Sequence, residues 1–283
     1  MNTGLSKVNF AGMMTSPDRF APIGVFDSGV GGLSILSHIH QHLPAESLIY
    51  VADNGHLPYG PKSSAHVTMR TRTISRFLIE QGVKSIVVAC NTATAAAIAT
   101  LRNEFNLPVI GVEPGVKPAI SQSRSGVIGV LATEGTLGSE KFQRLVATHG
   151  ESQQVIVQPC HGWVEQVERG ELYSELTRTL VAAAVEPLIR RGADTLVLGC
   201  THYPFLASVV RDVAGPAVEL IDTGEAIALE LQRRLHGLGL LADAARAGEP
   251  GFWSSGDPGP LSVQIKRLWP QAVSVERLPE AFR

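Results

Sequence analysis

The amino-acid sequence predicts an α/β fold of two similar three-layer α/β domains, with a ligand site in the cleft between them. Short apolar segments alternate with longer helical segments, which is the pattern of parallel βαβ units. Two strand-like segments that end at Cys90 and Cys200 lie 110 residues apart, and two that begin at Ile23 and Ile128 lie 105 residues apart. These nearly equal spacings indicate a duplicated unit in which each half presents one cysteine at the same place.

Length and composition fit this class and exclude several others. The chain has 283 residues, 44% of them hydrophobic and 18% charged, with a net charge of −2, so no basic surface argues for nucleic acid or an anionic membrane. No apolar run is long enough for a membrane helix, and residues 1–20, which we expect to be a loose extension, do not read as a signal peptide. Three cysteines are not a disulfide framework, and reduced thiols indicate the cytoplasm.

The predicted elements follow in order along two halves. In the first half we expect strand 22–27, a helix to 43, strand 47–52, helix 64–81, the strand that ends at Cys90, helix 92–105 and strand 108–112. In the second we expect a strand ending at 132, a helix to 148, strand 155–158, helix 172–189, the strand that ends at Cys200, a helix from 204, strand 217–221 and helix 223–235. The expected domains are residues 21–115 with 223–283, and residues 116–222, because 113–118 breaks the pattern and 251–283 carries too little amphipathic pattern to stand alone.

Cys90 and Cys200 each follow a buried strand and precede a helix. In open α/β sheets this carboxyl edge binds ligands, and the positive end of a helix favours a thiolate. Asn91 or Thr92 is the expected cap of the helix after Cys90, and Thr133 or Thr136 has the same role in the second half. The glycine-rich turn 27–32 and the proline- and glycine-rich loop 53–61 follow strands at the same edge, so we interpret both as site loops.

Other cysteine and histidine residues point to structural roles. Cys160 has no counterpart in the other half, so we expect a buried structural thiol. His38, His40 and His42 have no carboxylate or cysteine at ligand spacing, so we expect a solvated helix surface and no metal site. The sequence also lacks the C-x-x-C motif of a redox dithiol and the glycine patterns of nucleotide-binding loops.

Two thiols facing one small-molecule cleft can invert a stereocentre. One thiolate removes a proton from a carbon acid while the opposite thiol delivers a proton to the other face. The ordinary thiol pKa of about 8.5 needs only modest lowering for this task. The reaction runs in both directions between mirror-image substrates, so the two sides of the cleft should be alike.

Five segments together resemble the glutamate racemases of the cofactor-independent aspartate/glutamate racemase superfamily. The resemblance covers about residues 22–260, and it rests on GVFDSGVGGL at 24–33, LPYG at 57–60, ACNTA at 89–93, IGVEP at 110–114 and LGCTHYP at 198–204. It implies two α/β domains related by pseudo-twofold symmetry, interconversion of L- and D-glutamate without a cofactor, and supply of D-glutamate to peptidoglycan synthesis.

The resemblance also implies roles for particular residues. Cys90 and Cys200 would be the two acid/base groups, with Asp27 and Asp53 assisting the first and Glu168 and His202 the second, although Glu165 remains an alternative to Glu168. Contacts with substrate are expected from Asp27, Ser28, Tyr59, Gly60, Asn91, Thr92, Thr133, Thr136, Thr201 and His202. Activation by a nucleotide-linked cell-wall precursor and a homodimeric assembly are both compatible with the resemblance.

Three alternatives stay open at this point. A relative that acts on aspartate or a hydantoin would keep both cysteines and change the carboxylate pocket. An enzyme similar to maleate isomerase would form a covalent cysteine adduct. A non-enzymatic binding module would keep the cleft but bind its ligand unchanged when the cysteines are replaced.

Overall fold

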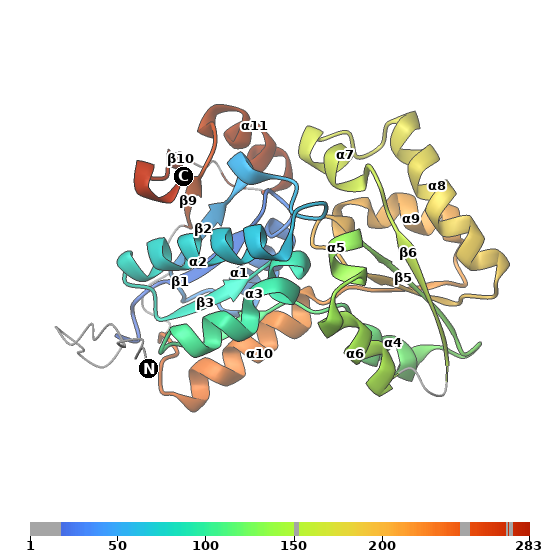
Figure 1. Cartoon of the computed structure of the whole chain (residues 1–283), viewed down its shortest axis with the longest axis horizontal. Helices are drawn as coiled ribbons and strands as arrows, with labels where there is room; N and C mark the ends of the chain where they lie inside the picture. Colours follow the sequence, from blue (N-terminus) through green and yellow to red (C-terminus); the bar gives the residue numbers. More distant parts are fainter. Residues whose placement is uncertain (1–17, 150–152, 244–249, 270, 272–273) are drawn as a thin grey trace, which may run out of the picture.

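The computed structural model describes residues 18–149, 153–243, 250–269, 271 and 274–283, and its strands form two separate parallel sheets in two lobes that lie side by side (Figure 1). The first sheet has the spatial order β10 (Val275–Arg277), β9 (Gly251–Ser254), β2 (Leu48–Ala52), β1 (Ile23–Asp27), β3 (Ser85–Val88) and β4 (Val109–Gly111). The second has the order β6 (Gln154–Pro159), β5 (Val127–Ala132), β7 (Thr195–Leu198) and β8 (Glu219–Ile221).

The two sheets repeat one topology. The order β2-β1-β3-β4 in the first sheet matches β6-β5-β7-β8 in the second. The register repeats as well, since Ile23 of β1 lies opposite Ser85 and Ile128 of β5 lies opposite Thr195. The predicted duplication is therefore confirmed, and Cys90 and Cys200 follow equivalent strands, β3 and β7.

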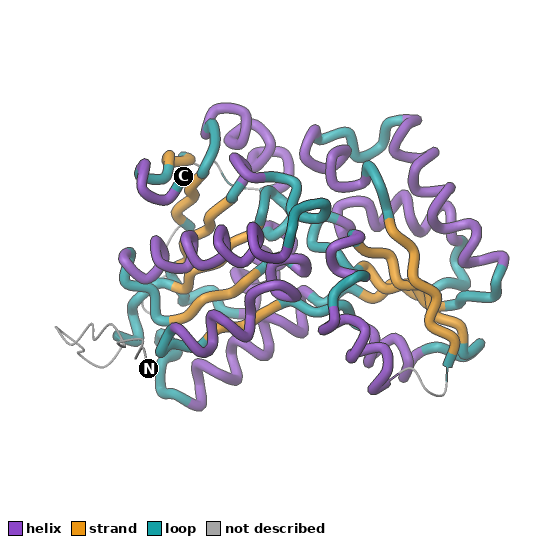
Figure 2. Tube along the Cα trace, viewed as in Figure 1, coloured by secondary structure: helices purple, strands orange, loops and turns teal. Residues whose placement is uncertain are grey.

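Helices cover both faces of each sheet, so each lobe has three layers (Figure 2). The helices beside the first sheet are α1 (Leu33–His42), α2 (Ser64–Glu80), α3 (Asn91–Glu104), α10 (Gly224–Gly237) and α11 (Pro258–Leu268). Those beside the second are α4 (Val116–Gln122), α5 (Glu134–Leu137), α6 (Glu140–His149), α7 (Trp163–Arg169), α8 (Glu175–Arg190) and α9 (Ala207–Ala214). Short 3₁₀ turns complete the described elements: η1 (Asn54–His56), η2 (Tyr203–Leu206) and η3 (Glu280–Phe282).

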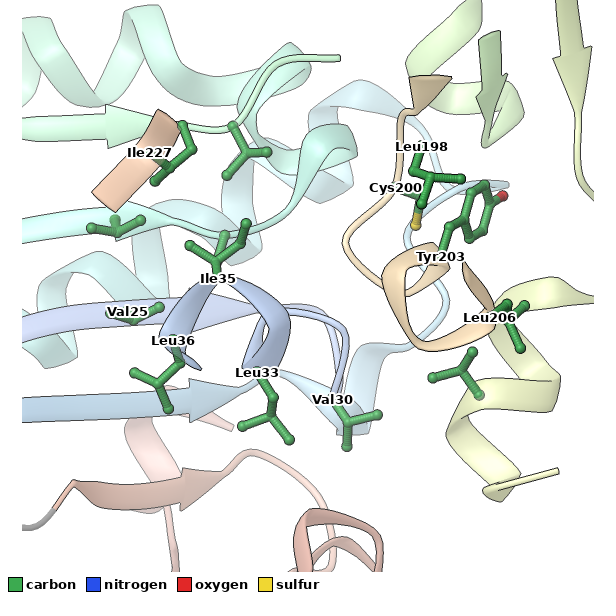
Figure 3. Close-up of a cluster of buried hydrophobic side chains, with 14 of the residues drawn as sticks. Val25, Val30, Leu33, Ile35, Leu36, Leu198, Cys200, Tyr203, Leu206 and Ile227 are labelled. Atoms are coloured by element: carbon green, nitrogen blue, oxygen red, sulfur yellow. The ribbon is translucent and has the colours of Figure 1, made fainter. Parts of the chain in front are cut away.

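One hydrophobic cluster is continuous between the lobes. It joins Val30 and Leu33 of the first lobe to Cys200, Tyr203 and Leu206 of the second, and all five are buried (Figure 3). The close packing of apolar side chains from both lobes stabilises their contact. The turn after β1 therefore belongs to the interface between the lobes as well as to the first sheet.

Two local predictions about helix starts need correction. Cys90 itself caps α3, and neither Asn91 nor Thr92 does, so the helix begins one residue earlier than expected. The segment after Cys200 begins as the 3₁₀ turn η2 and becomes α9 only at Ala207.

The C-terminal tail is more regular than its weak pattern indicated, since it adds β9 and β10 to the first sheet with α11 between them. The histidines of α1 are only partly solvated: all three are of intermediate exposure, and His40 packs on Trp269 with 5.5 Å between the ring centroids. The expected N-terminal extension lies almost entirely outside the described residues.

Candidate active site

A cavity of about 270 Å³ lies between the lobes and receives both cysteine side chains. The topology explains the position of this cavity. Cys90 and Cys200 lie at the carboxyl ends of central strands, where parallel sheets bind ligands. The predicted site residues that line it are Ser28, Tyr59, Gly60, Cys90, Asn91, Thr92, Thr133, Cys200, Thr201 and His202. The other predicted residues, Asp27, Asp53, Thr136 and Glu168, stand behind this lining and contact it.

Cys90 has its partners within the first lobe. Its thiol accepts a hydrogen bond from the Ala93 amide at 3.5 Å, and Ser28 Oγ lies 3.9 Å away. Burial, and next the Asp27 carboxyl, raise the pKa of Cys90 well above its usual value. The hydrogen bonds from the Ala93 amide and with Ser28 oppose this shift without reversing it, so the surroundings of Cys90 favour the thiol form.

Asp27 is fully buried behind the glycine-rich turn. Its Oδ2 accepts hydrogen bonds from the amides of Gly32 at 2.9 Å and Gly29 at 3.3 Å, whereas Oδ1 has no hydrogen-bond partner among the described residues. Burial raises its pKa above the ordinary value despite the nearby His202. A carboxyl in this state can exchange a proton at Oδ1 with a neighbouring group.

Cys200 is the first member of a chain of three side chains in the second lobe. Its Sγ lies 3.7 Å from Nδ1 of His202, and Nε2 of that ring lies 2.6 Å from Oε1 of Glu168. Burial alone would lower the pKa of His202, but the hydrogen bonds to Cys200 and Glu168 outweigh it and raise that pKa well above its usual value. An imidazolium beside Cys200 stabilises a thiolate there.

The described hydrogen-bond partners of the Asp53 carboxylate are Arg70 and Tyr59, and neither thiol is among them. Arg70 binds it in a two-pronged ion pair, with Nη2 at 2.8 Å from Oδ1 and Nε at 3.1 Å from Oδ2, and the Tyr59 hydroxyl donates to Oδ2 at 2.5 Å. Arg70 and Asp53 are both buried. The Asp53 carboxylate therefore positions Tyr59, which lines the cavity, and Arg70 is a site-supporting residue that the sequence interpretation missed.

Hydroxyl groups from both lobes meet at the cavity wall. Oγ1 of Thr92 lies 3.0 Å from Oγ1 of Thr133 and 3.4 Å from Oγ1 of Thr136, and Thr133 caps α5. The short side chains at the starts of α3 and α5 thus face one another across the cleft. Together with the Asn91 side chain they offer neutral donors for a carboxylate.

Several lining residues were missed or were given only a structural role. Cys160 is buried as expected, yet it lines the cavity, as do His161, Glu134 and Glu165. Burial raises the pKa of Cys160 far above its usual range. Cys160 and His161 follow the end of β6, and Gly162, with φ of 81°, turns the chain into α7. The rule that ligands bind at strand ends would have identified them.

Glu165 and Glu168, the two alternatives for the assisting carboxylate, occupy different places. Glu168 contacts His202, whereas Glu165 lines the cavity. Within the described residues, no group of three or more histidine, cysteine, aspartate or glutamate side chains could hold a metal ion. None of the described helices is long and apolar enough to cross a membrane.

Comparison with known proteins places this geometry in a family. Residues 23–231 match the family model described as Asp/Glu/Hydantoin racemase. A glutamate racemase of Methylococcus capsulatus is 57% identical over 261 residues, which cover 92% of this chain and 96% of the relative.

Solved structures agree with the sequence comparison. A glutamate racemase isoform from Bacillus anthracis superimposes with a TM-score of 0.86 at 35% identity, covering 94% of this chain and 100% of the other. Escherichia coli glutamate racemase, in complex with L-glutamate and the activator UDP-MurNAc-Ala, superimposes with a TM-score of 0.80 at 32% identity, covering 91% and 98%. The predicted fold class is confirmed, and the chain belongs to the Asp/Glu/Hydantoin racemase family.

Proposed function

We propose that this protein is an isomerase that interconverts L- and D-glutamate through two thiols and without a cofactor. The observation that carries the proposal is that Cys90 and Cys200, from equivalent positions of two repeated units, line one cavity. The similarity to glutamate racemases over more than nine-tenths of the chain supports glutamate as the substrate. Its D-glutamate would feed peptidoglycan synthesis.

Each turnover removes the α-proton from one face of the α-carbon and adds one proton to the opposite face. With D-glutamate, the Cys90 thiolate takes the α-proton, and the electron pair left on the carbon takes a proton from the Cys200 thiol on the opposite face. With L-glutamate the two cysteines exchange roles. Each turnover leaves one thiol and one thiolate in exchanged positions, and proton exchange with water restores the starting state.

The raised pKa of Cys90 favours its thiol form, which suits one direction of the reaction. A thiol is the form that donates, so Cys90 is ready when Cys200 removes the proton from L-glutamate. For the reverse direction the substrate itself helps, because an α-ammonium group brought into the buried cavity stabilises a nearby thiolate and lowers the pKa of Cys90. On the other side, His202 and Glu168 serve Cys200 as assisting groups.

The cavity recognises carboxylates through neutral donors. Among the described residues that line it, none is an arginine or a lysine. Ser28, Asn91, Thr92, Thr133 and Thr201 supply hydroxyl and amide groups instead, and hydrogen bonds to carboxylate from such groups are charge-assisted. Binding of this kind allows the product to leave a small site, since no ion pair between a substrate carboxylate and an arginine or lysine must be broken.

The proposal also covers the domain boundaries, the compartment, an activator and the oligomeric state. Residues 21–115 with 223–283 and residues 116–222 are the proposed domains, and the cytoplasm is the proposed compartment. The E. coli relative is solved with UDP-MurNAc-Ala as activator, so we propose to measure whether a nucleotide-linked cell-wall precursor activates this protein. Whether the protein forms a homodimer is a separate property to measure.

Racemisation in deuterated water tests the two-thiol reaction. The optical rotation or circular dichroism of D-glutamate should decay to zero, and early L-glutamate should carry deuterium at the α-carbon while the remaining D-glutamate keeps its hydrogen. A single base serving both faces would instead return the original hydrogen to product or wash deuterium into substrate. Cys90→Ala and Cys200→Ala should each abolish full racemisation. Full activity in either variant would reject the proposal, as would no turnover of glutamate by the wild-type protein.

A further inference from the structure

The glycine-rich turn of the first lobe directly contacts the acid/base groups of the second. The Val30 amide donates a hydrogen bond to Oε1 of Glu168 at 2.8 Å, and this is the same oxygen that lies 2.6 Å from His202. A Cβ atom on Gly31 would lie 2.2 Å from Nδ1 of His202, and one on Gly29 would lie 2.0 Å from Oε1 of Glu168. The imidazole and the carboxylate therefore occupy the space that side chains at these two positions would need.

Backbone conformation does not account for these glycines. Seven described glycines have a positive φ that favours glycine, and neither Gly29 nor Gly31 is among them. Space is the remaining constraint, because real side chains essentially never approach other atoms so closely. Glycine at these positions allows the backbone of the turn to contact His202 and Glu168 of the second lobe directly.

The contact serves only one of the two thiols. The described partners of Cys90, Ser28 and Ala93, come from its own lobe. For Cys200, the chain through His202 ends at Glu168, whose carboxylate is held by the first lobe. Contact between the lobes thus completes the proton-transfer group of Cys200, whereas the glycines of the turn reach Cys90 only indirectly, through the amides of Gly29 and Gly32 that bind Asp27.

We propose that Gly29 and Gly31 are positioning residues: their bare backbone allows the first lobe to hold Glu168 and His202 in place beside Cys200. The proposal rests on the proposed function, since it assigns Cys200 the α-proton of L-glutamate. It makes the base for the L enantiomer depend on contact between the two lobes, whereas the hydrogen-bond partners of the base for the D enantiomer lie in one lobe.

Two elimination half-reactions separate the thiols. In 3-chloroglutamate, a thiolate takes the α-proton, the electron pair of that bond forms a carbon–carbon double bond, and chloride leaves, so no second acid is needed. The L form then reports on Cys200 and the D form on Cys90. We expect Gly31→Ala and Gly29→Ala to lower kcat/KM for the L form on the order of 10²-fold, because a displacement of about 1 Å costs that much. The D form should lose much less activity, because the glycines of the turn reach Cys90 only through the amides that bind Asp27.

The matched control is Gly237→Ala, since a Cβ there meets no other atom within 4 Å. It should react like the wild type with both enantiomers. Equal losses with both enantiomers in Gly31→Ala and Gly29→Ala, or wild-type rates with the L form, would overturn the proposal. A different result would reject the proposed function itself. Cys90→Ala should lose elimination from the D form only and Cys200→Ala from the L form only, so any other division of the two activities would contradict the two-thiol reaction.

Stability gives a second measurement that works even if Gly31→Ala folds poorly. If the new methyl group collides with the imidazole, removing the ring should restore the space. The double variant Gly31→Ala/His202→Ala should then recover most of the melting temperature that Gly31→Ala loses, as a strongly non-additive pair. Additive losses, or a double variant that folds no better than Gly31→Ala, would show that the ring is not what the glycine accommodates.

Discussion

His202 contacts Glu168 with 2.6 Å between Nε2 and Oε1, and both side chains are buried. The carboxylate is one of the groups that raise the pKa of His202 above its ordinary value, against the effect of burial. Glu168 therefore favours the imidazolium form of His202 beside Cys200, where we propose that a thiolate forms when L-glutamate is the substrate.

Glu168→Gln should lower the pKa of His202, because it removes a negative charge and leaves burial to act on the ring. The imidazole would then lose its proton at a lower pH, and elimination from L-3-chloroglutamate should slow near neutral pH more than elimination from the D form. The ring ¹⁵N chemical shifts followed against pH measure the change directly. Glu165→Gln is the control, because Glu165 is not a hydrogen-bond partner of the ring; an equal shift in that variant would mean that the carboxylates act through the general field of the site.

Asp27→Asn should lower the pKa of Cys90. The Asp27 carboxyl is, after burial, the largest cause of the raised pKa of this thiol, and the amide keeps an oxygen for the turn while removing the charge. The rate of alkylation of Cys90 by iodoacetamide, measured by mass spectrometry against pH, should rise at lower pH in the variant than in the wild type. Asp212→Asn, an exposed and remote substitution, should leave the profile unchanged. An unchanged profile in Asp27→Asn would show that burial alone sets the pKa of Cys90.

Cys160→Ala should preserve racemisation although Cys160 lines the cavity. Burial raises the pKa of this thiol and favours its protonated form, and no histidine is among its hydrogen-bond partners in the described part of the chain. We expect a loss of stability on the order of 1 kcal/mol, measured by urea unfolding, and a kcat close to the wild type. A loss of turnover as large as that in Cys90→Ala would mean that Cys160 is one of the two reacting thiols.

Arg70→Met should destabilise the fold by about 3–5 kcal/mol, because it leaves the Asp53 carboxylate buried without its partner. Arg72→Met on the same helix is the control: its ion pair with Glu104 is partly exposed, with 41% of the arginine side chain accessible, so it should cost less than about 1 kcal/mol. Urea unfolding measures both. Adding Asp53→Asn to Arg70→Met should restore part of the loss, and a purely additive result would contradict the coupling of the two residues.

The sequence alone determined the repeated α/β units and the place of both thiols. Strands β3 and β7 are short, apolar and bounded by polar residues, and such periodic, local patterns reflect backbone geometry that each segment carries by itself. The position of a residue at the carboxyl end of a parallel strand follows from the same local information. This is why Cys90 and Cys200 could be assigned to one cleft before any distance was known.

Only the tertiary structure decided which side chains meet those thiols. Glu165 and Glu168 are three residues apart on α7 and share a helix face, so helical periodicity does not distinguish them. The tertiary structure does, because the Val30 amide of the other lobe donates a hydrogen bond to Glu168. Arg70 finds Asp53, and Gly31 makes room for His202, across segments distant in sequence. Such contacts depend on how lobes and helices pack, and packing is a property of the whole chain that no single segment encodes.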